Sequence, residues 1–222
     1  MNTYTEENYL KAIYKLSKSH DDGVNTNAIA DLLKTKASSV TDMIKKLNEK
    51  NLLNYVKYQG VTLTPEGEKV AVKIIRKHRL WEYFLVNCLN FKWDEVHDIA
   101  EELEHINSDK LINNLDKFLD HPKFDPHGDP IPDKDGNIYE HKEVSLADLE
   151  DKRSGIIVGV KDHSTQFLKY LEGIHLLLGT KVKIIKKFEY DDSILVSTGD
   201  NREIIVSNKV SRNLYIKKSI PK

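Results

Sequence analysis

The sequence predicts a mainly α-helical chain that also contains β structure, with helices in its first part and strands in its last. Apolar residues recur at helical spacing from residue 10 to about residue 119. Short β-branched runs separated by turn residues take over after residue 144. Between them, residues 121–143 are rich in Pro, Gly and Asp, which is typical of a linker or an ordered loop. We therefore predict three domains, at residues 1–72, 73–143 and 144–222.

The first domain is predicted to begin with three helices. A stripe of apolar residues that starts at Leu10 marks the first of them. Thr26 is expected to cap the second helix, and Ser38 or Ser39 is expected to cap the third, after a polar break at residues 34–36. Two short helices separated by a tight polar turn form a helix-turn-helix.

A β-hairpin and a further run of helices follow. Residues 52–63 predict two short strands joined by a turn at Gln59-Gly60, the wing of a winged helix-turn-helix. Thr64 at a cap and Pro65 at the first helical position then predict a new helix. The helices expected from here run from Pro65 to about Val86, from Trp93 to about Ile106, and over residues 109–119.

The last domain is predicted to be a small β-barrel. Its β-branched runs are separated by turns, and one helix is expected among them at residues 164–172. The predicted strands cover residues 155–160, 181–185, 194–197 and 203–206.

Charge is segregated along the chain, although the formal net charge is only -1. Residues 1–80 contain 14 Lys and Arg against 9 Asp and Glu, whereas residues 81–180 contain 10 against 21. A basic first part is compatible with phosphate contacts, and an acidic middle is compatible with cation binding. The single cysteine, Cys88, excludes an intramolecular disulfide, and no export signal or long apolar run is evident. We expect a cytoplasmic protein that does not contact a membrane.

A helical wheel of residues 93–108, at about 100° per residue, separates three faces. One face is apolar, and a second carries Glu95, Asp98 and Glu102, as an ordinary solvated face does. The third face combines imidazoles and carboxylates at positions i, i+4, i+7 and i+8. Its members are His97, Glu101, Glu104 and His105.

Two further donors, His78 and Glu82, are i and i+4 on the preceding predicted helix. Oxygen and imidazole donors without a thiolate suit manganese, iron(II) or zinc rather than copper(I) or an iron–sulfur cluster. The alternative is that each of these residues forms surface salt bridges only.

The predicted recognition helix carries polar residues on its outer face: Lys36, Ser38, Ser39, Thr41, Lys45 and Lys46. Short hydroxyl side chains at a helix start suit phosphate contact, because backbone N–H groups and the helix dipole already point there. The alternative is the polar outside of a small helix. Contacts to particular bases are not assigned.

Four segments together resemble the diphtheria toxin repressor family, which includes the iron-dependent repressors and the manganese transport regulators. They are ENYLKAIY at residues 7–14, RKHRLWE at residues 76–82, VHD at residues 96–98 with Glu104-His105, and PHGDPIP at residues 126–132. The resemblance extends over nearly the whole chain. It implies a winged-helix DNA-binding domain, a helical dimerisation and metal-binding domain, and an SH3-like C-terminal domain.

The resemblance also implies nine metal ligands. They form a primary site at Asn8, Glu101, Glu104 and His105, an ancillary site at His78, Glu82 and His97, and a C-terminal pair at His163 and Gln166. Iron-type members have Met and Cys at the positions of Asn8 and Glu101, whereas manganese-type members have carboxylates, so Glu101 favours manganese. Asn8 and Lys11 depart from the Asp and Glu of the manganese type. The two-site arrangement of the longer members therefore fits this chain better than a compact two-manganese cluster.

The function that the resemblance implies is repression of metal-uptake genes by a homodimer that binds double-stranded operator DNA, an expected inverted repeat, with Mn2+ as co-repressor. An Fe2+-responsive repressor is the alternative, and a winged-helix regulator that answers to an organic ligand without metal is a third interpretation. We expect no enzyme activity. Glu102-x-x-His105 and Glu172-x-x-His175 match the pairs of di-iron proteins, but the second pair lies in a β-rich region.

Overall fold

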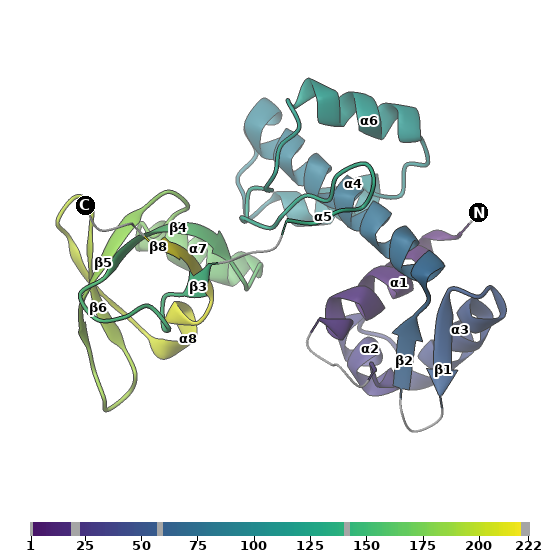
Figure 1. Cartoon of the computed structure of the whole chain (residues 1–222), viewed down its shortest axis with the longest axis horizontal. Coiled ribbons are helices and arrows are strands. Elements are labelled where there is room, and N and C mark those ends of the chain that lie inside the picture. The colour runs from purple at the N-terminus through teal and green to yellow at the C-terminus, as the bar shows by residue number, and fades with distance from the viewer. Residues whose placement is uncertain (1, 19–22, 57–59, 140–142, 219–222) are drawn as a thin grey trace. The chain divides into compact units, whose positions relative to one another are not determined.

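The computed structural model describes residues 2–18, 23–56, 60–139 and 143–218 (Figure 1). Two compact units divide these residues. Unit 1 comprises Met1–Trp81, Ala100–His121 and Pro132–Ile138, and unit 2 comprises Glu82–Ile99, Pro122–Ile131 and Tyr139–Lys222. The boundaries of the three domains stay a prediction.

The N-terminal part is a helix-turn-helix with a wing, as predicted (Figure 1). Its elements are α1 (Tyr4–Ser17), α2 (Thr26–Leu32), α3 (Ala37–Glu49), β1 (Leu53–Val56) and β2 (Gly60–Leu63). The inner faces of the three helices and the hairpin close one hydrophobic core, in which Leu10, Ile13 and Val40 are fully buried. Helical spacing of apolar residues dictates this packing, because residues three and four apart share one face.

Two of the predicted caps are wrong. Asn25, and not Thr26, caps α2, because the Asn25 side chain accepts a hydrogen bond from the Ala28 N–H at 2.8 Å. Neither Ser38 nor Ser39 caps α3: Lys36 is its N-cap residue and makes no side-chain cap hydrogen bond. Both serines instead lie exposed in the first turn. The backbone N–H groups at the start of α3 therefore lack a side-chain cap.

The wing pairs Leu53 with Leu63 and Val56 with Gly60 in an antiparallel register. Gly60 has a φ of +90°, and a Cβ there would lie 2.7 Å from the Val24 carbonyl oxygen, so glycine is required. The residues at 57–59 in the predicted wing turn, and those at 20–22 in the turn before α2, lie outside the described residues.

Three helices follow: α4 (Pro65–Leu89), α5 (Val96–Leu103) and α6 (Asp109–Phe118). Thr64 caps α4 as predicted, because its Oγ1 accepts a hydrogen bond from the Gly67 N–H at 3.1 Å. α5 is shorter than the predicted helix, since residues 93–95 form a turn and the helix ends at Leu103. Glu104 and His105 follow its last residue, and both are buried. No helix among the described residues is long and apolar enough to cross a membrane.

The C-terminal part is a six-stranded antiparallel sheet with two helices, as the predicted β domain requires (Figure 1). The strand order is β3-β8-β4-β5-β6-β7. Its elements are β3 (Val144–Ser145), β4 (Ser154–Val160), α7 (Thr165–Gly173), β5 (Lys181–Lys187), β6 (Ile194–Thr198), β7 (Glu203–Val206), α8 (Asn208–Ser211) and β8 (Leu214–Lys218). β3, α8 and β8 were not predicted. Register shifts in β4 and β5 mark β-bulges.

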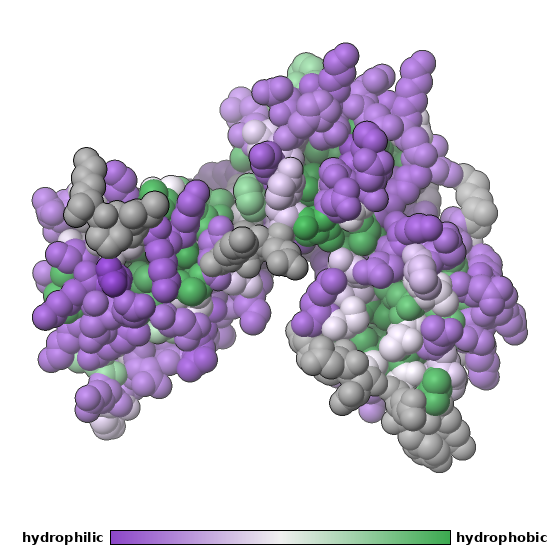
Figure 2. All heavy atoms as spheres, in the orientation of Figure 1, coloured by the Kyte–Doolittle hydropathy of each residue, from purple (hydrophilic) through white to green (hydrophobic). Residues whose placement is uncertain are grey.

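Alternating apolar residues of the strands close a second hydrophobic core with α7, in which Ile157, Ile184 and Val196 are fully buried. Most of the face shown in Figure 2 is hydrophilic, and hydrophobic atoms show only in small areas between polar side chains. The apolar residues are thus used mainly in the two cores.

Candidate metal centres and DNA-binding surface

A cluster of charged side chains in unit 1 joins α1 to the end of α5 and to α4. We call it the helix-one site. Its members are Glu7, Asn8, Lys11, His78, Glu101, Glu104 and His105. The Lys11 ammonium is its centre: Nζ lies 2.6 Å from Glu101 Oε1, 2.6 Å from Glu104 Oε1 and 2.7 Å from Glu104 Oε2. Lys11 and Glu104 are buried, so this pair lies out of water.

Two histidines complete the polar contacts of this site. His78 Nδ1 lies 2.6 Å from Glu104 Oε2, and His105 Nδ1 lies 2.7 Å from Glu7 Oε2. Tyr4 stacks on the His105 ring with a centroid distance of 4.6 Å. The carboxylates thus hold both imidazoles, as carboxylates orient histidines in metal sites.

Asn8 contributes an oxygen that the described residues do not satisfy. Its Oδ1 is buried and has no hydrogen-bond partner among them. Asn8 is three residues before Lys11 on α1, so the two share a helix face. The carboxylates and imidazoles of this site, and a buried amide oxygen on the same face of α1 as Lys11, are donors that suit a hard or borderline divalent cation. Lys11 already supplies one positive charge to Glu101 and Glu104. A metal cation bound there must therefore displace the ammonium or share the two carboxylates with it.

Of the predicted primary ligands, Glu101, Glu104 and His105 therefore lie within one contact network, with Asn8 on the adjoining face of α1. His78, predicted in the ancillary site, contacts Glu104. Glu7 is not among the ligands predicted from the sequence, and Lys11 enters that prediction only as a departure from the Glu of the manganese type. The signal for both was the i, i+4 spacing of Glu7 and Lys11, which puts them on one face of α1.

A second cluster lies in unit 2, where the loop before the C-terminal sheet meets Glu82 of α4. We call it the loop cluster: Glu82, Asp125 and His127 each offer one ligand atom, and these atoms lie within 4.8 Å of one another. All three side chains are buried. Asp125 Oδ1 accepts the N–H groups of His127 at 2.8 Å and Asp129 at 2.9 Å, which shapes the loop around the carboxylate.

One ring nitrogen of His127 is fixed by the backbone. Its Nε2 donates a hydrogen bond to the Trp93 carbonyl oxygen at 2.8 Å, because a carbonyl can only accept. Nδ1 is buried without a hydrogen-bond partner among the described residues and lies 3.6 Å from Glu82 Oε2. A backbone carbonyl that fixes one ring nitrogen and leaves the other toward a carboxylate is the usual arrangement of a metal-binding histidine.

Gly128 lets the loop approach the sheet. Its φ is +88°, and a Cβ there would lie 2.1 Å from the Val158 carbonyl oxygen. The His127 carbonyl oxygen accepts the Val160 N–H at 2.9 Å, which ties the loop to β4. The Pro- and Gly-rich segment is therefore an ordered loop at residues 122–131, while residues 140–142 lie outside the described residues.

Other predicted ligands differ in their relation to the loop cluster. His97 Nδ1 lies 3.6 Å from Glu82 Oε1. The His163 ring stacks on His127 at a centroid distance of 4.8 Å, and its Nε2 lies 4.0 Å from Asp129 Oδ2. Gln166 is exposed in the first turn of α7.

Asp125, His127 and Asp129 are not among the ligands predicted from the sequence. Their alternation as Asp-x-His-x-Asp, inside a segment rich in Pro and Gly, was the available signal. From the sequence this segment predicts a linker or an ordered loop, and residues 126–132 carry part of the family resemblance.

Protonation of His127 should stabilise the metal-free protein. Burial alone would lower the pKa of His127, but the carboxylates of Glu82 and Asp125, with the Trp93 carbonyl, raise it from 6.5 to about 9. A raised folded-state pKa gives stability that is fully present below about pH 6.5 and lost as the pH rises through 9. We expect a loss of about 3 kcal/mol in unfolding free energy across this range. Denaturant titrations in chelator would measure it, and H127Q should flatten the profile; an unchanged profile in H127Q would reject this cause.

The DNA-binding candidates lie on α3 and at its start. Lys36, Ser38, Ser39, Lys45 and Lys46 are exposed, whereas Thr41 is partly buried and its hydroxyl donates to the Ala37 carbonyl at 2.9 Å. An exposed helix start without a side-chain cap suits a phosphate oxygen.

Lys46 has an additional role within the fold. Its Nζ lies 3.0 Å from Glu6 Oε1, and Lys50 Nζ lies 2.7 Å from the same atom. Burial alone would raise the pKa of Glu6, but hydrogen bonds from Lys50, the Thr3 N–H and Lys46 lower it to about 2. These ion pairs join α3 to the first turn of α1.

Three family descriptions match the chain in succession. Residues 1–61 match the iron dependent repressor, N-terminal DNA binding domain, residues 64–133 match its metal binding and dimerisation domain, and residues 144–218 match the FeoA domain.

An uncharacterised HTH-type transcriptional regulator, MJ0568 of Methanocaldococcus jannaschii, is 38% identical over 51% of this chain and 91% of its own length. The iron-dependent repressor IdeR of Mycobacterium leprae is 34% identical over 58% of this chain, and the matched part spans 55% of IdeR. A solved structure of a manganese-dependent transcriptional repressor in complex with manganese has a TM-score of 0.87 and 33% identity, and covers 96% of this chain and 100% of the other. The chain belongs to the family of iron- and manganese-dependent transcriptional repressors that includes the diphtheria toxin repressor.

Proposed function

We propose that this chain is a cytoplasmic, homodimeric repressor of metal-uptake genes with Mn2+ as its co-repressor. The observation that carries this proposal is the donor chemistry of the two clusters, which are built from carboxylates, imidazoles and one amide oxygen without a thiolate. Such donors suit manganese among the transition metals, and iron(II) remains the alternative because IdeR is an iron-dependent repressor.

The residues assigned to the metal fall into two sets. Asn8, Glu101, Glu104 and His105, with His78 beside them, would hold a cation in the helix-one site. Glu82, Asp125 and His127, with His163 and His97 nearby, would hold one in the loop cluster. A bound divalent cation supplies positive charge that carboxylates of separate elements can share.

The side chains of the helix-one site would set the position of α1. Glu101 and Glu104 extend from α5 and its end, whereas Asn8 and Lys11 come from α1, whose other face is part of the core of the DNA-binding part. Ligands that gather around one cation favour a single arrangement of these elements, and the coupling between metal and DNA is the free-energy difference between arrangements. In a homodimer, two α3 helices would then reach half-sites of an inverted repeat, with centres about one helical turn apart.

The experiment is an anisotropy titration of operator DNA selected from a random duplex library in manganese. The chain should bind in Mn2+, bind more weakly in other divalent cations and fail in chelator. E101A and H105A should lose at least about tenfold in metal-stimulated affinity, about 1.4 kcal/mol. E102A, which changes an exposed neighbour, is the matched control. Chelator-insensitive binding would favour the regulator without metal dependence and reject this function.

Contacts from the start of α3 to phosphate should depend on salt. We expect K36A to weaken binding to all duplexes about equally and to reduce the slope of log affinity against log salt by about one. S39A should weaken binding with little change of slope, because it removes a neutral donor. K69A, a lysine on α4 that pairs with Glu66, serves as the control. An unchanged slope in K36A would remove Lys36 from the DNA-binding surface.

A further inference from the structure

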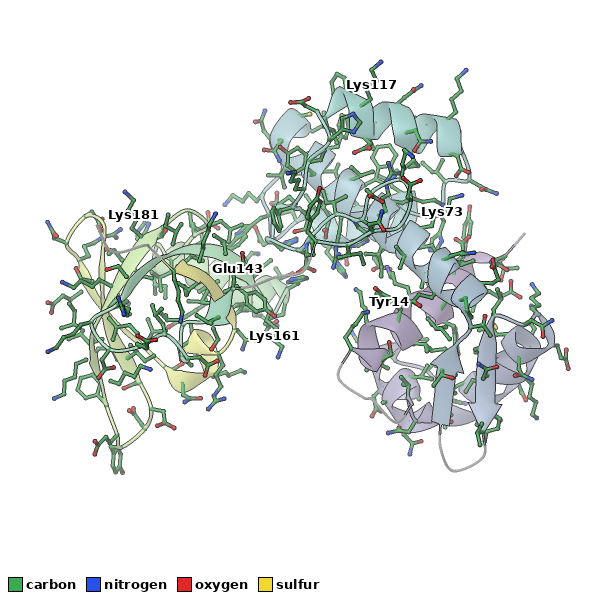
Figure 3. All side chains as sticks on the ribbon, in the orientation of Figure 1. Tyr14, Lys73, Lys117, Glu143, Lys161 and Lys181 are labelled. Carbon is green, nitrogen blue, oxygen red and sulfur yellow. The ribbon has the colours of Figure 1, made fainter. Side chains whose placement is uncertain are left out.

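A cavity of about 780 Å³ lies in unit 1, beside the N-terminal half of α4. Its walls come from α4, from α6, from residues 133–138 and from Tyr14 of α1. Figure 3 labels Tyr14 and Lys73, two of its lining residues. Pockets of roughly 300–1,000 Å³ are the usual size for small organic ligands. The cavity shares no lining side chain with the helix-one site or the loop cluster.

One wall of the cavity is basic, although Glu68, Asp109, Asp133 and Asp135 also line the cavity. Four cations of α4 line it at positions i, i+4, i+7 and i+8, on one face of the helix. They are Lys69, Lys73, Arg76 and Lys77. The first three have acidic partners: Lys69 pairs with Glu66 at 2.9 Å, Lys73 with Asp109 at 2.6 Å and Arg76 with Asp116 at 2.9 Å.

Lys77 differs from these three. Its side chain belongs to a residue that is only 4% exposed, and it forms no hydrogen bond or ion pair with the described residues. The stem of Lys77 is therefore packed, while its ammonium remains free to donate to a ligand in the cavity. Arg76 is not a second free donor, because its terminal nitrogens bind Asn113 and Asp116 and its Nε is buried out of reach of a ligand.

Another part of the cavity wall is apolar. Val72, Ile112 and Ile138 line the cavity together with the Tyr14 ring. A ligand that matched both walls would carry a negative group for the Lys77 ammonium and an apolar body for these side chains. A free inorganic ion would leave the apolar wall unfilled.

We propose that this cavity binds a small organic anion, whose carboxylate or phosphate group accepts hydrogen bonds from Lys77 and whose apolar part packs against Val72, Ile112 and Ile138. The cavity shares no lining residue with either metal centre, although Lys77 precedes His78 and interacts electrostatically with Glu7 and Glu104 of the helix-one site. Binding of the anion can be measured in chelator, so its test is independent of which metal the chain binds.

The test uses the full chain in chelator and three probes of similar shape: benzoate, phenyl phosphate and neutral benzamide. Saturation-transfer NMR and calorimetry should detect binding of one or both anions and not of benzamide. K77M should weaken anion binding by at least about tenfold, which is about 1.4 kcal/mol, while K77R should retain it. K110M, which changes an exposed lysine of α6, should bind as the unchanged chain does.

Thermal unfolding gives a readout that does not use a ligand. Because Lys77 makes no hydrogen bond or ion pair with the described residues, K77M should be about as stable as the unchanged chain. Equal binding of benzamide and benzoate, equal binding of K77M and the unchanged chain, or no binding of either anion would each overturn the proposal. Should K77M fail to fold, K77Q replaces it in the same comparison.

Discussion

Replacing Glu104 with Gln should lower the unfolding free energy of the metal-free protein by about 3 kcal/mol or more. The Glu104 carboxylate is fully buried and receives Lys11 Nζ on both oxygens, at 2.6 and 2.7 Å. It also lies 2.6 Å from His78 Nδ1. A neutral amide would leave the buried ammonium with Glu101 alone, and removing one partner of a buried ion pair is strongly destabilising.

Denaturant unfolding in chelator would measure this loss. E102Q, at an exposed position two residues earlier, is the matched control and should change stability by about 0.5 kcal/mol or less. The same E104Q protein should show no metal-stimulated operator binding. An E104Q protein as stable as E102Q would show that the ion pair with Lys11 is not part of the folded state in solution.

Replacing Lys11 with Met should have the opposite effect on metal binding. The ammonium lies against both carboxylates that a divalent cation would use, so the two cations compete for Glu101 and Glu104. Removing one of two competing charges at about 4 Å changes the interaction by several kcal/mol even at an effective dielectric of about 20. Allowing for relaxation, we expect the affinity for manganese to rise by about tenfold to a hundredfold, or about 1.4 to 2.8 kcal/mol.

The control for this change is K15M. Lys15 is one turn further along α1, is exposed and acts on Glu101 and Glu104 only through space. Calorimetric titration with manganese alone would compare the manganese affinities of K11M, K15M and the unchanged chain. K11M should also melt at a lower temperature than the unchanged chain in chelator, because two carboxylates then face each other, and should gain more from manganese. Equal affinities in K11M and K15M would show that Lys11 does not compete with the cation.

Periodicity carried the prediction of the winged helix, the helical middle and most strands, because each depends on local spacing. The stripe of Glu101, Glu104 and His105 came from the same spacing, although the structure ends α5 at Leu103. Their role as ligands stays a prediction. β8 was missed because two of its five residues are lysines, which obscure the β-branched pattern.

The contacts of Lys11 and the loop cluster depend on distant segments and were beyond local reasoning. Lys11 is separated from Glu104 by 93 residues, and nothing near it in sequence shows that α1 faces the end of α5. Asp125 and His127 likewise meet Glu82 only through the fold of the loop. The predicted cap of α2 is wrong for a simpler reason. Asn25 precedes Thr26, and both residue types are common N-caps, so only the backbone conformation decides which of them caps the helix.

The ion pairs of Glu6 with Lys46 and Lys50 have a mechanical consequence. Glu6 also belongs to the capping box of α1 and immediately precedes Glu7 and Asn8. These ion pairs and the shared hydrophobic core join α1 to the far end of α3. Under the proposed function, a metal that repositions α1 would therefore move α3 together with it.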